Sequence, residues 1–143
     1  MVRATVNTDA SWCPSTKSGG WAVWIAIDGG QRIKKSGTFH RKAKTSTEAE
    51  LWAMLNGAWI AAQHGARTLL MQGDCVAALT ALEQGVDDAV RLLHASVPAP
   101  VTLTTRHVKA HTHTNSARHW VNDWCDREAK KHMRKERQQT HKR

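Results

Sequence analysis

Two aspartates in this sequence follow strand-like apolar segments and could take part in metal-dependent chemistry. The segment 2–9 ends on Asp9, and the segment 67–74 ends on Asp74. Strands linked by a crossover can end side by side at one edge of a sheet, where binding sites tend to form. The sequence therefore predicts two carboxylates at the same edge.

Two further acids could join this pair. Glu50 lies in the first turn of a predicted helix, and Asp126 or Asp123 comes from the last predicted helix. Clustered carboxylates repel one another unless some are protonated or a cation offsets their charge. Oxygen ligands without cysteine or histidine favour Mg²⁺ or Mn²⁺. The cluster indicates a divalent metal, whereas each acid taken singly could be a turn former, a helix-terminal charge or a solvated side chain.

A zinc site is the alternative metal chemistry, since histidine and cysteine are the usual zinc ligands. The candidate ligands are His107, His111, His113, His119 and Cys125. Their spacing matches no common zinc finger, so the carboxylates remain the stronger hypothesis.

The elements that must position the carboxylates follow from apolar periodicity and turn residues. Strand composition is found in the segments 2–9, 21–28, 31–39, 67–74 and 101–108. Helical spacing is found in the segments 45–64, 75–85, 87–95 and from about residue 116 onward. Ser46 or Thr47 could cap the first helix, and Gly65 should end it. The first three strands should form an antiparallel meander.

The order of elements, β-β-β-α-β-α-α-β-α, predicts an α/β fold with a five-stranded mixed sheet and helices on both faces.

A length of 143 residues with 41% hydrophobic content suits one core. No apolar run approaches the roughly 20 residues of a membrane helix, and the start lacks the features of a signal peptide. Three cysteines, an odd number, suit reduced thiols. We therefore expect a cytoplasmic monomer.

The positive charge is concentrated near the C-terminus. The chain has a formal net charge of +9, and residues 101–143 hold 11 basic against 4 acidic side chains. A field of this sign favours a polyanion such as nucleic acid. Apolar periodicity is lost beyond about Met133, which predicts fraying or disorder there. The basic tail could alternatively serve only solubility.

Five motifs occur in the order and on the elements of one known family. They are TDAS at Asp9 with GG ten and eleven residues later, TSTEAEL around Glu50, GDC at Asp74, VKAH at His111 and NDWCDREA around Asp126. Over roughly residues 3–130 the sequence resembles ribonuclease H type I. The resemblance implies a ribonuclease H-like fold, with residues 1–133 as the catalytic domain and residues 134–143 as a flexible basic tail.

By this resemblance the activity is endonucleolytic cleavage of the RNA strand of RNA/DNA hybrids. It implies two Mg²⁺ ions per site, replaceable by Mn²⁺, and products with 5′-phosphate and 3′-hydroxyl ends. Asp9 would bridge the metals, Glu50 and Asp74 would complete the shell of one ion, and Asp126 that of the other. The motifs select Glu50 over Glu48.

The same resemblance bears on the remaining site residues. Asp126 is selected over Asp123, which stays the fallback one helical turn earlier. His111 would assist proton transfer or product departure, a role suited to a side chain that titrates near neutrality. His113 could substitute for it.

Substrate contacts depart from the better-known bacterial pattern. Ser46 and Thr47 stand where many relatives have two asparagines, and Val76 stands where they have a polar side chain that contacts the substrate. The basic protrusion of many relatives is missing. Thr45 matches a hydroxyl that holds a DNA-strand phosphate, and Trp12 or Trp21 could add an aromatic platform or be buried. The candidate substrate contacts are Cys13, Thr45, Ser46, Thr47, Lys130, Lys131, Arg134 and Lys135.

Two other functions stay open at this point. One is a structure-specific nuclease on the same fold that acts on branched DNA. The other is an inert nucleic-acid-binding module, although a binder gains nothing from carboxylates that face phosphate.

Overall fold

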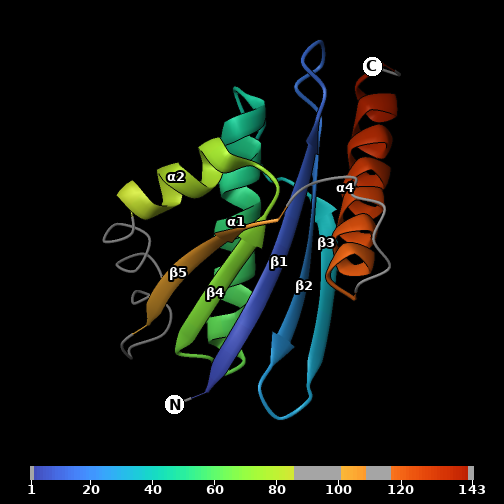
Figure 1. Cartoon of the computed structure of the whole chain (residues 1–143). Helices are drawn as coiled ribbons and strands as arrows, with labels where there is room; N and C mark the ends of the chain where they lie inside the picture. Colours follow the sequence, from blue (N-terminus) through green and yellow to red (C-terminus); the bar gives the residue numbers. More distant parts are fainter. Residues whose placement is uncertain (1, 86–100, 109–116, 142–143) are drawn as a thin grey trace.

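The chain forms a five-stranded sheet flanked by helices in a computed structural model that describes residues 2–85, 101–108 and 117–141 (Figure 1). The elements are β1 (Arg3–Trp12), β2 (Gly19–Ile27), β3 (Arg32–Thr38), α1 (Ser46–Gln63), β4 (Thr68–Gly73), α2 (Val76–Gln84), β5 (Thr102–His107) and α4 (Ala117–His141). The short helix expected at 87–95 lies outside the described residues. No helix within the described part is long and apolar enough to cross a membrane.

The sheet has the strand order β3-β2-β1-β4-β5. The first three strands are antiparallel neighbours, as predicted, whereas β4 pairs parallel with β1 and β5 pairs parallel with β4. The helix α1 supplies the crossover from β3 to β4. The predicted mixed sheet is therefore confirmed, with its parallel half beside the meander.

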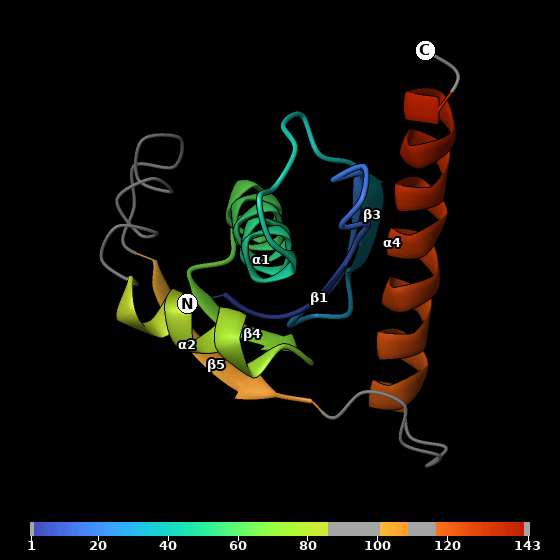
Figure 2. The ribbon, with the colours of Figure 1, turned by 90° about the horizontal axis from the view of Figure 1, so that it is seen from above.

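Helices lie on both faces of the sheet, as Figure 2 shows, with α1 and α2 on one side and α4 on the other. The face toward α1 holds the larger apolar core, which includes Val6, Ile25 and Leu69. Small residues let α1 approach closely, because a Cβ built on Gly57 would lie 2.7 Å from Cγ1 of Val6. The opposite face packs a smaller cluster against α4, centred on Trp24.

The strand β1 is longer than the sequence predicted. It continues past Asp9 to Trp12, because its antiparallel pairing with β2 runs as far as Trp12 opposite Gly19. Its parallel pairing with β4 ends earlier, at Asn7 opposite Gln72. Asp9 therefore lies within β1, two residues beyond the last residue of this strand that pairs with β4.

The fraying expected beyond Met133 is wrong for residues 134–141, because α4 continues to His141. Tertiary contacts hold this part of the helix where apolar periodicity is absent. Oε1 of Glu136 accepts a hydrogen bond from the backbone N–H of Gly19 at 3.2 Å, and Nζ of Lys42 lies 3.4 Å from the same oxygen.

Candidate active site

Three carboxylates meet at the end of the sheet where β4 gives way to α2. Asp74 directly follows β4, and Asp9 lies on the neighbouring strand two residues beyond the last β1–β4 pair. Glu50 reaches the same place from α1. One carboxylate oxygen of each residue lies within 4.8 Å of those of the other two. Topology thus brings together acids that are separated by more than twenty residues in the chain.

The start of α1 explains why Glu50, and not Glu48, faces this edge. Thr45 is the N-cap, and its hydroxyl accepts a hydrogen bond from the backbone N–H of Glu48 at 3.0 Å. Glu48 in turn accepts one from the backbone N–H of Lys44 at 3.1 Å. This reciprocal cap stabilises the first turn. The expected cap at Ser46 or Thr47 is therefore wrong by one or two residues, and Glu50 begins the second turn rather than lying in the first.

Burial and mutual repulsion hold protons on this cluster. Asp9 is only 2% exposed, and its pKa is raised to about 10 by desolvation, then by the charges of Glu50, Asp74 and Asp126. Burial and the charge of Asp74 raise the pKa of Glu50 to about 8. In the absence of a cation, burial and mutual repulsion therefore favour the protonated forms of Asp9 and Glu50.

The donor set fits a hard divalent cation. Oδ1 of Asp9 accepts a hydrogen bond from the backbone N–H of Ala10 at 2.9 Å, whereas Oδ2 is buried with no partner in the described part of the chain. An unpartnered buried carboxylate oxygen is costly unless a cation or proton satisfies it. Oxygen ligands alone suit Mg²⁺ or Mn²⁺. Asp9, Glu50 and Asp74 are the residues that could hold such an ion.

Asp126 lies near the cluster but outside the closest set. Its charge contributes to the raised pKa of Asp9, and its Oδ2 lies 3.0 Å from Nζ of Lys130 on the next turn of α4. Asp123 is exposed and lines a shallow pocket beside Asp126, together with Trp120. Asp126 therefore contributes to the raised pKa of Asp9, whereas Asp123 is not among the causes of that shift.

Cys125 anchors the helix that carries Asp126. Its side chain is fully buried, and its Sγ donates to the backbone carbonyl of Asn7 at 3.8 Å. Desolvation, followed by the nearby carboxylates, raises the pKa of this thiol. A thiol held protonated is a poor zinc ligand. Among residues 2–85, 101–108 and 117–141, three possible metal-ligating side chains come together only at Asp9, Glu50 and Asp74.

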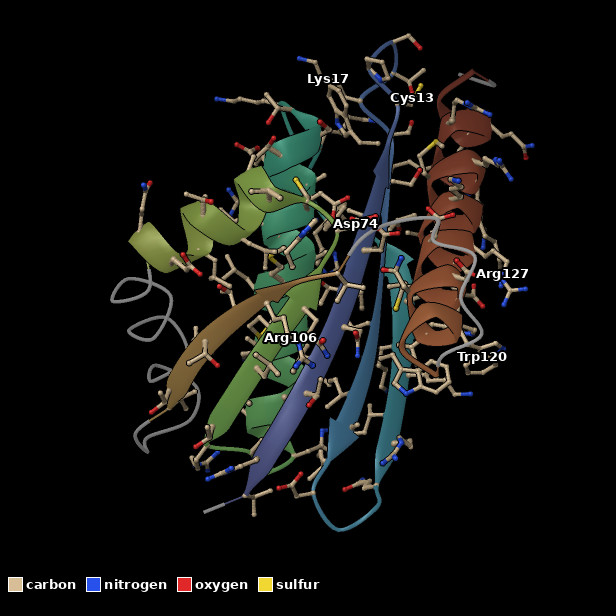
Figure 3. The ribbon with its side chains drawn as sticks, in the orientation of Figure 1. Cys13, Lys17, Asp74, Arg106, Trp120 and Arg127 are labelled. Carbon is tan, nitrogen blue, oxygen red and sulfur yellow. The ribbon has the colours of Figure 1, made fainter. Side chains whose placement is uncertain are left out.

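Two residues of β5 extend the site: Arg106, which the sequence analysis did not select, and His107, which it considered only as a zinc ligand. Nε of Arg106 donates to Oε1 of Gln72 at 2.9 Å, and Nε2 of His107 donates to the backbone carbonyl of Asp74 at 3.2 Å. Figure 3 shows Arg106 on the strands below Asp74. The rule that selected Asp74, the end of a parallel strand, would have selected His107 as well, because β5 ends on it.

The expected substrate contacts on the N-terminal half lie in the loop between β1 and β2 and at the start of α1. Cys13 and Lys17 belong to the hairpin loop between β1 and β2 (Figure 3). Hydrogen bonds from Ser15 and Thr16 lower the pKa of the buried Cys13 thiol to about 6. Ser46 is exposed and Thr47 is half-buried.

The basic candidates on α4 differ in their surroundings. Lys130 is engaged with Asp126, and Nζ of Lys131 lies 3.4 Å from Oε2 of Glu128. Arg134 and Lys135 are exposed. The loop histidines His111 and His113, and the side chain of His119, lie outside the described residues.

Comparisons with known proteins show which protein family and which solved structures this chain is similar to. The family model for reverse transcriptase-like proteins matches residues 7–98. No curated protein matches the sequence. Solved structures with a similar fold include the N-terminal ribonuclease H domain of a Mycobacterium tuberculosis protein, fused to maltose-binding protein. Its TM-score is 0.72 at 14% identity, covering 97% of this chain and 99% of that one.

Two further structures show the same likeness. Ribonuclease H1 from the halophilic archaeon Halobacterium salinarum has a TM-score of 0.66 at 15% identity, covering 93% of this chain and 98% of that one. LC11 ribonuclease H1, solved in complex with an RNA/DNA hybrid, has a TM-score of 0.65 at 14% identity, covering 92% and 97%. At such low identity these matches establish a shared fold.

Proposed function

The chain belongs to the reverse transcriptase-like family and has the ribonuclease H type I fold, and from this premise we propose that it is an endoribonuclease that hydrolyses the RNA strand of RNA/DNA hybrids. The observation that carries the proposal is the meeting of Asp9, Glu50 and Asp74 within 4.8 Å at one sheet edge. A binding module would not need buried carboxylates beside a polyanion.

The proposed catalytic set is Asp9, Glu50, Asp74 and Asp126. When bound, two divalent cations would supply an activated water and stabilise the charge that develops on the leaving 3′ oxygen. Asp9, Glu50 and Asp74 would hold one ion, and Asp9 with Asp126 the other. The products would carry 5′-phosphate and 3′-hydroxyl ends.

Proton release and the packing of α4 would prepare the site for the cations. Asp9 and Glu50 must release the protons that burial keeps on them, so cation binding and proton loss are coupled at this site. The hydrogen bond from Sγ of Cys125 to the backbone carbonyl of Asn7 would hold α4 against β1 and thereby position Asp126. His111 would assist proton transfer or product departure.

A hybrid is the substrate that the surroundings support best. A related fold has been solved with an RNA/DNA hybrid bound. The exposed hydroxyls of Thr45 and Ser46 at the start of α1 can hydrogen-bond phosphate or ribose oxygens. Arg134 and Lys135 add positive charge on α4 that attracts phosphates.

The test is an end-group analysis of cleavage. A labelled RNA/DNA hybrid is incubated with the full chain in Mg²⁺, in Mn²⁺ and in EDTA, with Asp9→Asn as the control. We expect RNA cleavage in both metals, none in EDTA, and a loss of at least a hundredfold in the variant. Cleavage of a branched DNA junction in preference to the hybrid would instead assign a structure-specific DNA nuclease, and no cleavage of either would leave a binding module.

A further inference from the structure

A second hollow lies apart from the carboxylates, between α1 and the β3 edge of the sheet. It has a volume of about 470 Å³, within the roughly 300–1,000 Å³ of typical small-molecule sites. Four of its walls are aromatic and come from three parts of the chain. They are Trp21 on β2, Phe39 just after β3, and Trp52 and Trp59 on α1.

Most of these rings are held in place. Nε1 of Trp21 donates to the backbone carbonyl of Thr38 at 3.3 Å. Phe39 and Trp52 form an edge-to-face pair with ring centroids 5.7 Å apart. Rings fixed in this way offer flat surfaces at little entropic cost to a ligand. Trp59 differs, because it is 47% exposed and has one side open to solvent.

The rim of this aromatic pocket is basic. His40 and Arg41 line it from the segment that joins β3 to α1, and none of its lining residues is acidic. Arg41 is exposed and forms no ion pair within the described part of the chain. Asn56 lines the pocket from α1 and carries an amide that can both donate and accept hydrogen bonds.

Aromatic faces next to positive charge are the combination that single-stranded nucleic acid requires. The rings stack on the bases, and the cations contact the backbone phosphates. A duplex cannot use such a pocket because its bases are already stacked and paired. A purely apolar partner would leave the guanidinium of Arg41 without complementary charge.

We propose that the aromatic pocket binds an unpaired nucleobase of single-stranded nucleic acid. The base stacks against Trp59, Asn56 hydrogen-bonds its edge, and Arg41 contacts a flanking phosphate. The segment from Phe39 to Lys44 leads from the pocket to Thr45 at the start of α1. A single-stranded extension of a substrate held at the carboxylates is therefore the natural source of the base.

The test measures binding without cleavage. The full chain carrying Asp9→Asn, in EDTA, is titrated into a labelled ten-nucleotide single strand and into a matched strand whose central positions are abasic. Both strands carry the same phosphates, so the difference in affinity reports the bases alone. We expect the abasic strand to bind at least fivefold more weakly.

Substitutions at the pocket locate that difference. Trp59→Leu should weaken binding of the normal strand about five- to tenfold and bind both strands almost equally, whereas Trp59→Phe should keep most of the discrimination. Arg41→Gln should weaken both strands and lower their salt dependence. The matched control is Arg3→Gln at the exposed start of β1, which should change neither.

Three results would overturn the proposal. They are equal affinity of the unsubstituted pocket for both strands, unchanged discrimination in Trp59→Leu, and a self-association that Trp59→Leu abolishes while strand binding persists. The last would assign the pocket to a second copy of the chain. Because the assay needs no catalysis, its failure leaves the hybrid-cleavage result standing, and failure of hybrid cleavage leaves this result standing.

Discussion

Nζ of Lys130 lies 3.0 Å from Oδ2 of Asp126, one turn earlier on α4. The pair is partly exposed, with 41% of the lysine side chain and 26% of the aspartate side chain accessible. The ammonium offsets a carboxylate whose charge otherwise adds to the repulsion felt at Asp9. Lys130, expected to contact substrate, thus also stands where it competes with a cation for Asp126.

Replacing Lys130 with glutamine should strengthen binding of Mg²⁺ to the substrate-free protein. Removing one positive charge beside Asp126 leaves that carboxylate free to attract the ion, and a partly exposed i,i+4 pair of this kind is worth about 0.3–0.5 kcal/mol. Calorimetric titration should therefore show a dissociation constant lower by about twofold. Lys131→Gln is the control, because its partner is Glu128. Weaker binding in Lys130→Gln would mean that the lysine holds Asp126 in its binding position.

Stability of the metal-free protein should fall as the pH rises. The pKa of Asp9 is raised from 3.8 to about 10, and that of Glu50 from 4.5 to about 8. For a raised pKa, the folded state is favoured fully below the unfolded value, and this advantage is lost as the pH rises through the folded value. Thermal melts in EDTA should therefore show a decreasing Tm between about pH 5 and 9.

Asp9→Asn should remove much of this decrease. The amide cannot ionise, so the variant should melt a few degrees above the unsubstituted protein at pH 8 and close to it at pH 5. Excess Mg²⁺ should reverse the ranking, because only the unsubstituted protein keeps its full ligand set. A Tm that is independent of pH in EDTA would show that the cluster is already ionised without metal.

Asp126→Asn should reduce hybrid cleavage far more than Asp123→Asn. Asp126 is close enough to raise the pKa of Asp9, whereas Asp123 is exposed one turn away. We expect at least a hundredfold loss of kcat for the first and less than fivefold for the second. Steady-state kinetics on the same hybrid measures both. The opposite ranking would move the fourth ligand of the proposed site to Asp123.

Local patterns were enough to predict the strands, the meander and the helices that position Asp9, Glu50 and Asp74. The spacing of apolar residues and the positions of turn residues are local features, so they can be identified directly in the sequence. The end of β1 could not be predicted, because pairing with β2 rather than any turn residue extends it past Asp9.

Long-range contacts account for the other differences. The helical continuation of α4 depends on Glu136 binding Gly19, across 117 residues of sequence. The pairing of Arg106 with Gln72 requires the register of β4 and β5. The aromatic pocket brings together Trp21 of β2 and Trp59 of α1, and neither residue type nor local period predicts that these two rings meet.

Arg134 and Lys135 should contribute to substrate affinity and not to turnover. Both are exposed on α4, whereas the hydrogen bond and ion pair that hold this part of the helix come from Glu136. In the Arg134→Gln, Lys135→Gln double variant, the slope of log affinity against log salt should become shallower. Each lost phosphate contact should reduce its magnitude by about 0.9. KM should rise at moderate salt while kcat at saturating hybrid stays nearly normal.

Two substitutions test the phosphate contacts better than a deletion of residues 134–143 would, because the deletion would also remove Glu136 and its contacts to Gly19 and Lys42. Glu136→Gln serves as the separate control for helix docking and should lower Tm without changing the salt slope. An unchanged slope in the double variant would place the phosphate contacts elsewhere on the domain.

Gly20→Ala should destabilise the protein and misplace Asp126 together. A Cβ at Gly20 would lie 2.6 Å from the backbone nitrogen of Met133 and 2.8 Å from Cβ of His132, so α4 must move away from β2. Overpacking of this kind costs about 1–3 kcal/mol. Because Asp126 is on the same helix, kcat should fall as well. Gly85→Ala is the control, since among the described residues its Cβ would meet only the carbonyl of Ala81, at 3.3 Å. Chemical denaturation and hybrid cleavage measure the two effects, and a Gly20→Ala variant with normal stability would show that α4 does not pack this closely on β2.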